Sequence, residues 1–180
     1  MKRYGVIGLG SFGYYVAKSL FEAGNEVIAM DVNRTRVQSI EDYCTDAVVL
    51  DATDKEKLKA MGLNEMDAVV VSTGEKISTS ILICYYLHAF EVKRIVVKSV
   101  DIDHAEILKM VGATETIHPE KDMAARIARG LTKPNILNFI PLEEGYDIIQ
   151  AEAPDAFSGN TLEELQLRKK YKVFIIAVKQ

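Results

Sequence analysis

The sequence predicts an α/β fold, a doubly wound parallel sheet of six strands with helices on both faces. Short apolar runs alternate with longer helical stretches through the first two thirds of the chain, and this alternation is typical of a parallel sheet. The runs are nearly continuous in Val, Ile and Ala, which indicates strands that are covered on both faces. A glycine-rich segment directly follows the first run, as in folds that bind a ligand at the carboxyl edge of the sheet.

The six apolar runs define the expected strands at 4–7, 27–30, 47–50, 68–71, 95–97 and, more weakly, 115–118. The stretches between them, near 11–24, 33–43, 54–62, 76–90 and 102–111, are the expected helices. Crossovers between parallel strands are right-handed. We therefore expect the strand order 3-2-1-4-5-6, with the ligand beside the first strand, where the order reverses.

A different organisation is expected beyond the sixth strand. A helix runs from 119 to about 131, and Pro134 marks a break because the residue before a proline resists the helical conformation. Residues 136–141 are apolar without a period, which suggests an irregular connection, and 146–152, 161–167 and 173–178 read as strand, helix and strand. We predict a first domain at 1–134 that includes the helix, a hinge at 135–145, and a partial α+β subdomain at 146–180.

Length and composition limit the function classes. At 180 residues the chain holds one full domain and part of a second. The net charge of −4 leaves no general basic face, so we expect no nucleic-acid partner. The two cysteines lie far apart, which argues against a disulfide framework or a zinc site. No apolar run approaches the ~18 residues of a membrane span, and no signal peptide is visible, so we expect a cytoplasmic chain.

The first candidate site is the loop after the first strand, whose residues Gly8, Gly10, Ser11, Phe12 and Gly13 fit the pattern G-x-G-x-x-G. Gly8 permits a tight turn, Gly10 lets a pyrophosphate approach the backbone, and Gly13 allows close packing of helix and strand. The helix N-terminus that follows offers N–H groups and partial positive charge to phosphate. The loop predicts a Rossmann-like domain that binds NAD(H) or an adenine nucleotide.

The second candidate is Asp31, which ends the second apolar run about 20 positions after the loop. A carboxylate there accepts hydrogen bonds from ribose hydroxyls and repels a 2′-phosphate, which favours NAD or an adenosine nucleotide over NADP. The alternative is an ordinary Asx turn before Asn33. Val32, Asn33 and Arg34 are further candidates for contact with the ribose or the base.

Polar residues also follow the third strand. Asp51, Ala52 and Thr53 stand where the carboxyl end of this strand can flank an adenine. The alternative is that Thr53 or Asp54 caps the next helix, and both roles are compatible.

Ser72, Thr73 and Gly74 follow the fourth strand and are expected to line the distal part of the ligand, or else to form a loop chosen for flexibility. The chain has no room for a separate catalytic domain, and its three histidines have no metal-binding spacing. We therefore expect a binding module and not an enzyme. The alternative is a small NAD-dependent oxidoreductase domain.

Several of these motifs together resemble the RCK (TrkA-N) family of K⁺ transport regulators, and KtrA-type gating subunits most of all. They are the loop at 8–13, Asp31, the segments 51–53 and 95–98, and above all the sequence Gly-Ala-Thr-Glu-Thr-Ile-His-Pro-Glu-Lys-Asp-Met at 112–123. Residues 161–178 resemble the first half of the TrkA-C subdomain of this family. The resemblance implies a cytosolic regulatory subunit that controls a membrane pore. Its competing ligands would be ATP or NADH on one side and ADP or NAD⁺ on the other.

The resemblance also implies an assembly. Members dimerise through the helix and hinge after the sixth strand, here 123–131 and 135–140, and dimers form an octameric ring beneath a pore subunit of the KtrB or TrkH kind. The residues that would make the apolar stripe of the dimerising helix are Met123, Ala124, Ile127, Ala128 and Leu131.

Two further site residues are implied by the resemblance alone. Lys98 matches a lysine that can face the phosphates, or it is a solvated strand end. Glu120 matches a residue that binds Mg²⁺ or Ca²⁺ near the phosphates at the dimer interface, or it complements the dipole of its helix. Ser11 departs from the family, which often has an arginine there, and this favours NAD(H), ADP or AMP over ATP.

Overall fold

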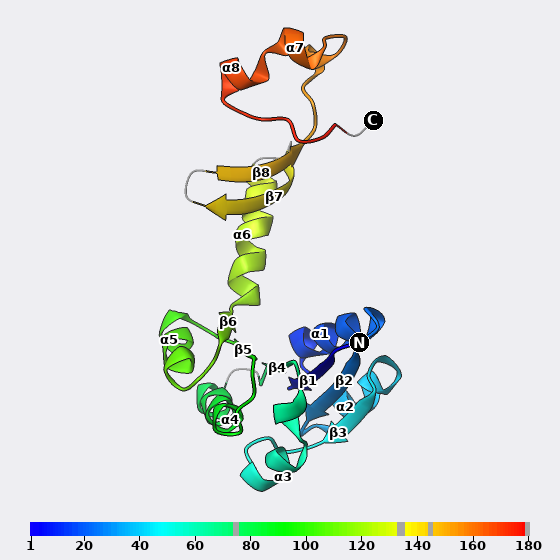
Figure 1. The fold of residues 1–180 in the computed structure, drawn as a ribbon, viewed down its shortest axis with the longest axis vertical. Coiled ribbons are helices and arrows are strands. Elements are labelled where there is room, and N and C mark those ends of the chain that lie inside the picture. Colours follow the sequence, from blue (N-terminus) through cyan, green and yellow to red (C-terminus); the bar gives the residue numbers. More distant parts are fainter. Residues whose placement is uncertain (74–75, 133–135, 144–145, 179–180) are drawn as a thin grey trace. The chain divides into compact units, whose positions relative to one another are not determined.

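A computed structural model describes residues 1–73, 76–132, 136–143 and 146–178 (Figure 1). Its contacts divide the chain into two compact units, Met1–Met123 and Ala124–Gln180. This division falls inside a helix rather than at residue 134, so the assignment of domains at 1–134, 135–145 and 146–180 stays a prediction.

The first unit contains the predicted six-stranded parallel sheet. Its strands are β1 (Arg3–Ile7), β2 (Glu26–Asp31), β3 (Asp46–Val49), β4 (Ala68–Val71), β5 (Ile95–Lys98) and β6 (Glu115–Ile117). The order is β3-β2-β1-β4-β5-β6 and every neighbouring pair is parallel. This confirms the order 3-2-1-4-5-6, with the reversal between β1 and β4.

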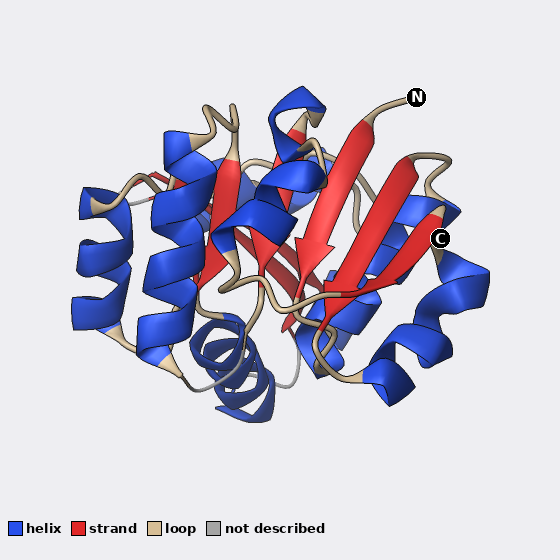
Figure 2. Ribbon diagram, turned by 90° about the horizontal axis from the view of Figure 1, so that it is seen from below, coloured by secondary structure: helices blue, strands red, loops and turns tan. Residues whose placement is uncertain are grey.

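Helices cover both faces of this sheet (Figure 2). They are α1 (Ser11–Glu22), α2 (Arg34–Ile40), α3 (Lys55–Ala60), α4 (Ile77–Ala89) and α5 (Ile102–Met110), with 3₁₀ turns η1 (Glu41–Tyr43) and η2 (Leu63–Glu65). Residues of α1 and α2 pack in one core, and residues of α3, α4 and α5 in another. Successive strand residues alternate between the two cores, as Val6 and Ile7 do, because side chains of a strand point to opposite faces.

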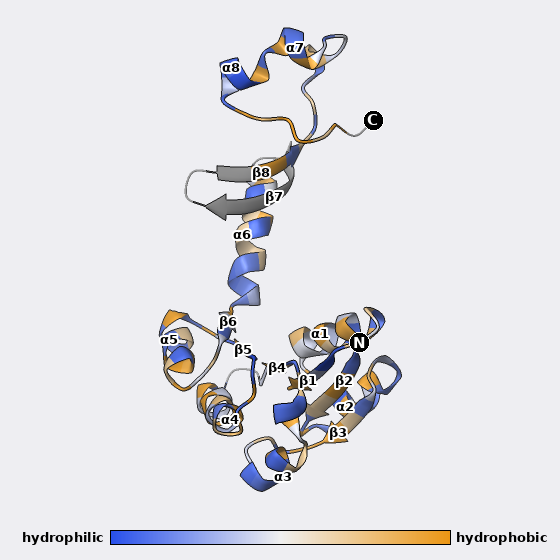
Figure 3. Cartoon of the chain, in the orientation of Figure 1, coloured by the Kyte–Doolittle hydropathy of each residue, from blue (hydrophilic) through white to orange (hydrophobic). Residues whose placement is uncertain are grey.

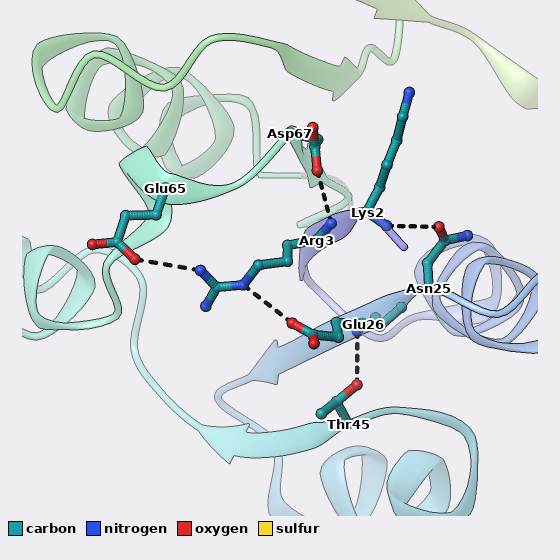
Figure 4. Close-up of polar contacts among 8 residues, drawn as sticks. Lys2, Arg3, Asn25, Glu26, Thr45, Glu65 and Asp67 are labelled. Atoms are coloured by element: carbon teal, nitrogen blue, oxygen red, sulfur yellow. Dashed lines mark hydrogen bonds and ion pairs between the residues drawn. The ribbon is translucent and has the colours of Figure 1, made fainter.

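Arg3 closes the amino edge of the sheet (Figure 4). Its guanidinium pairs with Glu26 at 3.2 Å and with Glu65 at 3.3 Å, and its backbone N–H donates to Asp67 at 2.8 Å. These contacts join the starts of β1 and β2 to the segment that leads into β4. Exposed pairs of this kind contribute little stability. They lie at the edge of the sheet opposite the glycine loop.

The second unit begins within α6 (Pro119–Thr132) and contains a hairpin and short helices. Its elements are β7 (Ile136–Glu143), β8 (Tyr146–Ala151), η3 (Asp155–Phe157), α7 (Leu162–Leu165) and α8 (Leu167–Tyr171). The prediction of an irregular connection at 136–141 was wrong, because this run forms β7 and pairs antiparallel with β8. A short apolar run without a clear period is also compatible with a strand.

The strand expected at 173–178 is absent, and this segment has no regular structure. Its residues are hydrophobic (Figure 3), yet Phe174 and Ile176 are exposed. A strand needs a neighbour to satisfy its backbone groups, and none of the described strands pairs with this one. The helix expected at 161–167 forms as α7 and α8, separated at Gln166, which has a left-handed φ of 48°. Thr161 starts α7 through a capping box with Glu164.

Candidate nucleotide-binding site

The parallel sheet gathers the predicted site residues at its carboxyl edge. The glycine loop follows β1, Asp31 ends β2, Asp51 follows β3, Ser72 follows β4 and Lys98 ends β5. In folds of this topology ligands bind outside this edge, at the point where the strand order reverses. Gly74 lies outside the described residues.

The glycines of the loop have different surroundings. Gly8 has a φ of 91°, and a Cβ there would lie 2.2 Å from the carbonyl oxygen of Ser72. A Cβ on Gly13 would lie 1.9 Å from the carbonyl oxygen of Gly8. A Cβ on Gly10 would meet no described atom within 4 Å. Gly8 and Gly13 therefore serve the close approach of loop, helix and β4, while Gly10 leaves open space at the start of α1, where N–H groups lack partners within the helix.

Asp31 fastens this loop to the end of β2. The residue is 6% exposed, and its Oδ2 accepts a hydrogen bond of 2.6 Å from the N–H of Leu9. Its Oδ1 accepts from the N–H of Asn33 at 2.8 Å, so the Asx turn considered from the sequence is present. A carboxylate has about four acceptor positions. The turn therefore does not exclude the ribose role, for which acceptor capacity remains.

Two neighbours of Asp31 have roles that the sequence did not show. Asn33 caps α2, because its side-chain oxygen accepts from the N–H groups of Thr35 and Arg36. Arg36 stands in the first turn of α2, and its guanidinium lies 3.6 Å from Oδ2 of Asp31. Arg36 was not among the residues predicted from the sequence. Val32 and Arg34 are exposed beside them.

The residues after β3 form a small polar turn. Asp51 accepts hydrogen bonds from the hydroxyl of Thr53 at 2.6 Å and from its N–H at 2.9 Å. These bonds, the hydroxyl first, hold the pKa of Asp51 below its usual value. Asp54 caps α3 by accepting from the N–H of Lys57, so the capping alternative is correct for this residue. Ala52 is buried between them.

The residues after β4 lie against the glycine loop. Ser72 is 6% exposed and its N–H donates to the carbonyl of Ile7 at 2.7 Å. The hydroxyl oxygen of Thr73 is buried and has no hydrogen-bond partner among the residues that the structure describes. An unpaired buried hydroxyl is costly, and a bound ligand that offers a donor or acceptor can satisfy it.

Lys98 and Glu120 form an ion pair that joins the end of β5 to the first turn of α6. The side chain of Lys98 is 17% exposed and that of Glu120 is 63% exposed. The hydrogen bond from Lys98 is the main reason why the pKa of Glu120 lies below its usual value. The structure therefore brings together the two residues that only the family resemblance had singled out.

Two classes of feature are missing from the described part of the chain. It holds no cluster of three or more His, Cys, Asp or Glu side chains placed to bind a metal ion. None of its helices is both long enough and apolar enough to cross a bilayer.

Comparisons with known proteins agree with this architecture. Residues 4–119 match the TrkA-N domain family. Ktr system potassium uptake protein C of Bacillus subtilis (strain 168) is 39% identical over 179 residues, which span 99% of this chain and 81% of that protein. Ktr system potassium uptake protein A of the same organism is 36% identical over 178 residues, which span 99% and 80%.

Solved structures share the fold. The GsuK channel bound to NAD has a TM-score of 0.62 and 22% identity, over 94% of this chain and 30% of that one. GsuK bound to ADP has a TM-score of 0.59 and 23% identity, over 72% and 34%. At this identity the likeness concerns the fold alone. The family match spans more than half of the chain, and it coincides with the glycine loop and the six-stranded sheet. The chain belongs to the TrkA-N (RCK) family.

Proposed function

We propose that this chain is a cytoplasmic, nucleotide-binding regulatory subunit of a K⁺ uptake system. The main support is the geometry of the glycine loop. The loop has open space at the start of α1, and the N–H of Leu9 binds it to Asp31 at 2.6 Å. The chain is also 39% identical to a Ktr potassium uptake protein. The partner would be a membrane pore subunit of the KtrB or TrkH kind.

The ligand we propose is NAD(H) or an adenine nucleotide, with its phosphates at the start of α1 and its ribose at Asp31. GsuK structures that share this fold bind NAD and ADP, and this supports the same ligand class here. Ser11 is exposed in the first turn of α1 and offers a hydroxyl rather than a cation. A neutral donor compensates a third phosphate less well than an arginine does. We therefore propose that NAD(H), ADP and AMP bind at least as tightly as ATP.

A divalent cation at this site would depend on the ligand. Ca²⁺ takes about six to eight oxygen ligands. Among the described residues of one chain, Glu120 offers one carboxylate at this place, and that carboxylate is already paired with Lys98. Mg²⁺ or Ca²⁺ would therefore need nucleotide oxygens, water and a second copy of the chain to complete its coordination. We propose that cation binding follows nucleotide binding and does not occur alone.

The proposed output is a change of assembly shape. Ligands shift an equilibrium only through different affinities for its two states. We propose that a homodimer, joined through α6 and the hinge at 135–145, assembles into an octameric ring, and that the ring responds to nucleotide identity. The oligomer and the domain division at 1–134, 135–145 and 146–180 are part of this proposal.

The experiment combines affinity with mass. Isothermal titration of AMP, ADP, ATP, NAD⁺ and NADH is run beside native mass spectrometry of the chain with each ligand. We expect binding of at least one adenine nucleotide, and an assembly larger than a monomer. A folded monomer that binds none of these ligands would overturn the proposal.

The alternative, a small NAD-dependent oxidoreductase, is tested by the absorbance of NADH. Binding without turnover is expected for a sensor across a panel of carbonyl, flavin and quinone acceptors. Sustained oxidation of NADH that depends on a specific acceptor would replace the sensor with the oxidoreductase.

A further inference from the structure

A buried polar link joins the start of α4 to the loop after β5. His104, in the first turn of α5, is 2% exposed, and its Nε2 lies 2.9 Å from Oγ of Ser80. Ser80 Oγ donates in turn to the carbonyl oxygen of Ile77 at 2.9 Å. At the other side of the ring, the N–H of Val100 donates to Nδ1 at 3.2 Å. None of the roles proposed above for the site uses this link.

The partners of the ring determine which nitrogen carries the proton. A backbone N–H can only donate, so Nδ1 of His104 accepts from Val100 and carries no hydrogen in the neutral ring. The proton then sits on Nε2 and is donated to Ser80, whose own hydrogen is used by the carbonyl of Ile77. A second proton on Nδ1 would face the N–H of Val100. The link is therefore complete in the neutral ring and cannot persist in the charged one.

Both ends of the link lie at the carboxyl edge of the sheet. Ile77 begins α4, directly after the loop that carries Ser72 and Thr73. Val100 follows Lys98 by two positions, and between them Ser99 donates to the carbonyl of Ile117 from its N–H at 2.8 Å and from its hydroxyl at 3.1 Å. The bonds thus run from the first turn of α4 through the loop after β5 to the end of β6.

We propose that His104 is a positioning residue for the nucleotide site, and that protonation of its ring opposes nucleotide binding. The neutral ring holds the first turn of α4 and the loop after β5 in one arrangement, because a buried polar network that is fully satisfied specifies a single geometry. His104 touches no ligand and acts through Ser80 and Val100. This inference rests on the proposed function, since it concerns the regulation of the same site.

The surroundings of the ring favour its neutral form. Burial lowers the pKa of His104 below its usual 6.5, and the field of Asp101, which caps α5, opposes this effect only in part. From α4, the thiol of Cys84 is neutral near pH 7 because burial raises its pKa to about 11. From β6, Glu115 is paired with an arginine. Among the described groups, Asp101 is thus the charged one whose field reaches the ring.

The test is the pH dependence of NAD⁺ affinity, because the phosphates of NAD⁺ do not titrate between about pH 5 and pH 7.5. The wild-type chain is compared with His104→Asn, which keeps an acceptor near Val100, and His104→Gln, which keeps a donor near Ser80. We expect the wild-type affinity to fall about fivefold or more over this range as the ring is protonated. The variants are expected to give flat profiles. His88→Gln is the matched control that should retain the wild-type slope.

A second readout follows the ring itself. The pKa of ¹³C-labelled His104 is measured by NMR with and without saturating NAD⁺, and binding is expected to lower it, since linkage is reciprocal. If His104→Asn does not fold, Ser80→Ala and this NMR titration in the wild-type chain decide the question. A wild-type pH slope retained in a folded His104 variant, or a His104 pKa that NAD⁺ leaves unchanged, overturns the inference alone. Failure of the wild-type chain to bind any adenine nucleotide at about pH 7.5 overturns the proposed function as well.

Discussion

At the scale of single residues, the three loop glycines serve different ends. Gly8 and Gly13 leave no space for a side chain, whereas Gly10 faces open space. The pattern G-x-G-x-x-G does not distinguish between the three glycines. The surroundings separate two glycines needed for the fold from a third, Gly10, that leaves the space where we propose a phosphate binds.

Substitutions of Gly13 and Gly10 by alanine should therefore separate stability from binding. A Cβ at Gly13 meets the carbonyl oxygen of Gly8 at 1.9 Å, so Gly13→Ala is expected to lower the free energy of unfolding by about 2 kcal/mol or more. Gly10→Ala is expected to keep stability within about 1 kcal/mol and to weaken ADP binding, because the methyl group occupies the place of the phosphates. Urea unfolding and calorimetric titration measure the two effects. Equal losses of stability would contradict this separation.

Asp31 holds the glycine loop in place and is also the residue that we propose contacts the ribose, so a substitution there can change both stability and affinity. Its oxygens hold Leu9 and Asn33, so Asp31→Ala is expected to cost about 1.5–3 kcal/mol of stability through lost charged hydrogen bonds. A loss of ADP affinity in Asp31→Ala would therefore not distinguish a lost ribose contact from a disturbed glycine loop. Asp31→Asn keeps one acceptor and is expected to lose ADP affinity with a smaller loss of stability. Both are measured by urea unfolding and titration of the folded chain. Unchanged ADP binding in Asp31→Asn would remove Asp31 from the ribose role.

At the scale of elements, the pair of Lys98 and Glu120 connects β5 to α6. Because Glu120 is largely exposed, the pair is expected to contribute less than about 1 kcal/mol of stability. The folded-state pKa of Glu120 is lowered, so this contribution is present above its usual pKa of 4.5 and is lost as the pH falls below that value. The difference in unfolding free energy between the wild-type chain and Glu120→Gln should vanish in acid.

The same pair gives a sharper prediction about ligands. Without divalent cations, Glu120→Gln frees Lys98 from its partner, and ADP is expected to bind more tightly. Lys98→Met is expected to weaken ADP binding, because it removes a cation near the phosphates. Calorimetry in the presence of a chelator compares these two variants with the wild-type chain. Equal ADP affinity in all three would separate the pair from the site. If Glu120 also ligates a cation, added Mg²⁺ should strengthen ADP binding in the wild-type chain but not in Glu120→Gln.

Elements beyond the sheet show where local pattern fails. Residues 136–141 carry no period, yet β7 forms there because β8 supplies its hydrogen bonds. Residues 173–178 carry a convincing strand pattern, yet no described strand pairs with them. Whether a run becomes a strand depends on the neighbour as much as on the run itself.

At the scale of the whole molecule, α6 has an apolar stripe whose members are exposed. Met123, Ile127 and Leu131 recur at every fourth position and are 51%, 56% and 80% exposed. If α6 joins two copies of the chain, Ile127→Asp places a charge in the interface and should lower the mass found by sedimentation. Arg126→Asp, at an exposed α6 position outside this stripe, is the control and should leave the mass unchanged. An unchanged mass in Ile127→Asp would exclude this stripe as the dimer contact.

Stability of the whole chain should also depend on pH through His104. Its pKa is lower in the folded chain than the usual 6.5, so the unfolded chain binds more protons in mild acid, and stability falls as the pH drops below that value. We expect the midpoint of urea unfolding to fall between about pH 7.5 and pH 5.5. The fall should be smaller in His104→Asn. An equal fall in both would assign the acid sensitivity to other groups.

The sequence alone determined the sheet and its order, and it predicted where a nucleotide would bind. Six buried runs, their spacing, the loop from Gly8 to Gly13 and Asp31 were sufficient, because hydrophobic period, turn chemistry and the handedness of crossovers are local or general rules. The sequence motifs also indicated the family, and the comparisons confirmed it. The individual site residues remain predictions.

Only the tertiary structure decided which side chains meet. The bond from Leu9 to Asp31, the approach of Arg36, the pair of Lys98 and Glu120, and the link through His104 each join residues whose contact no local pattern shows. His104 is buried although histidine is polar, because a polar ring enters a core when each of its nitrogens finds a partner there. Such partners come from distant segments, and the folded sheet alone brings them together.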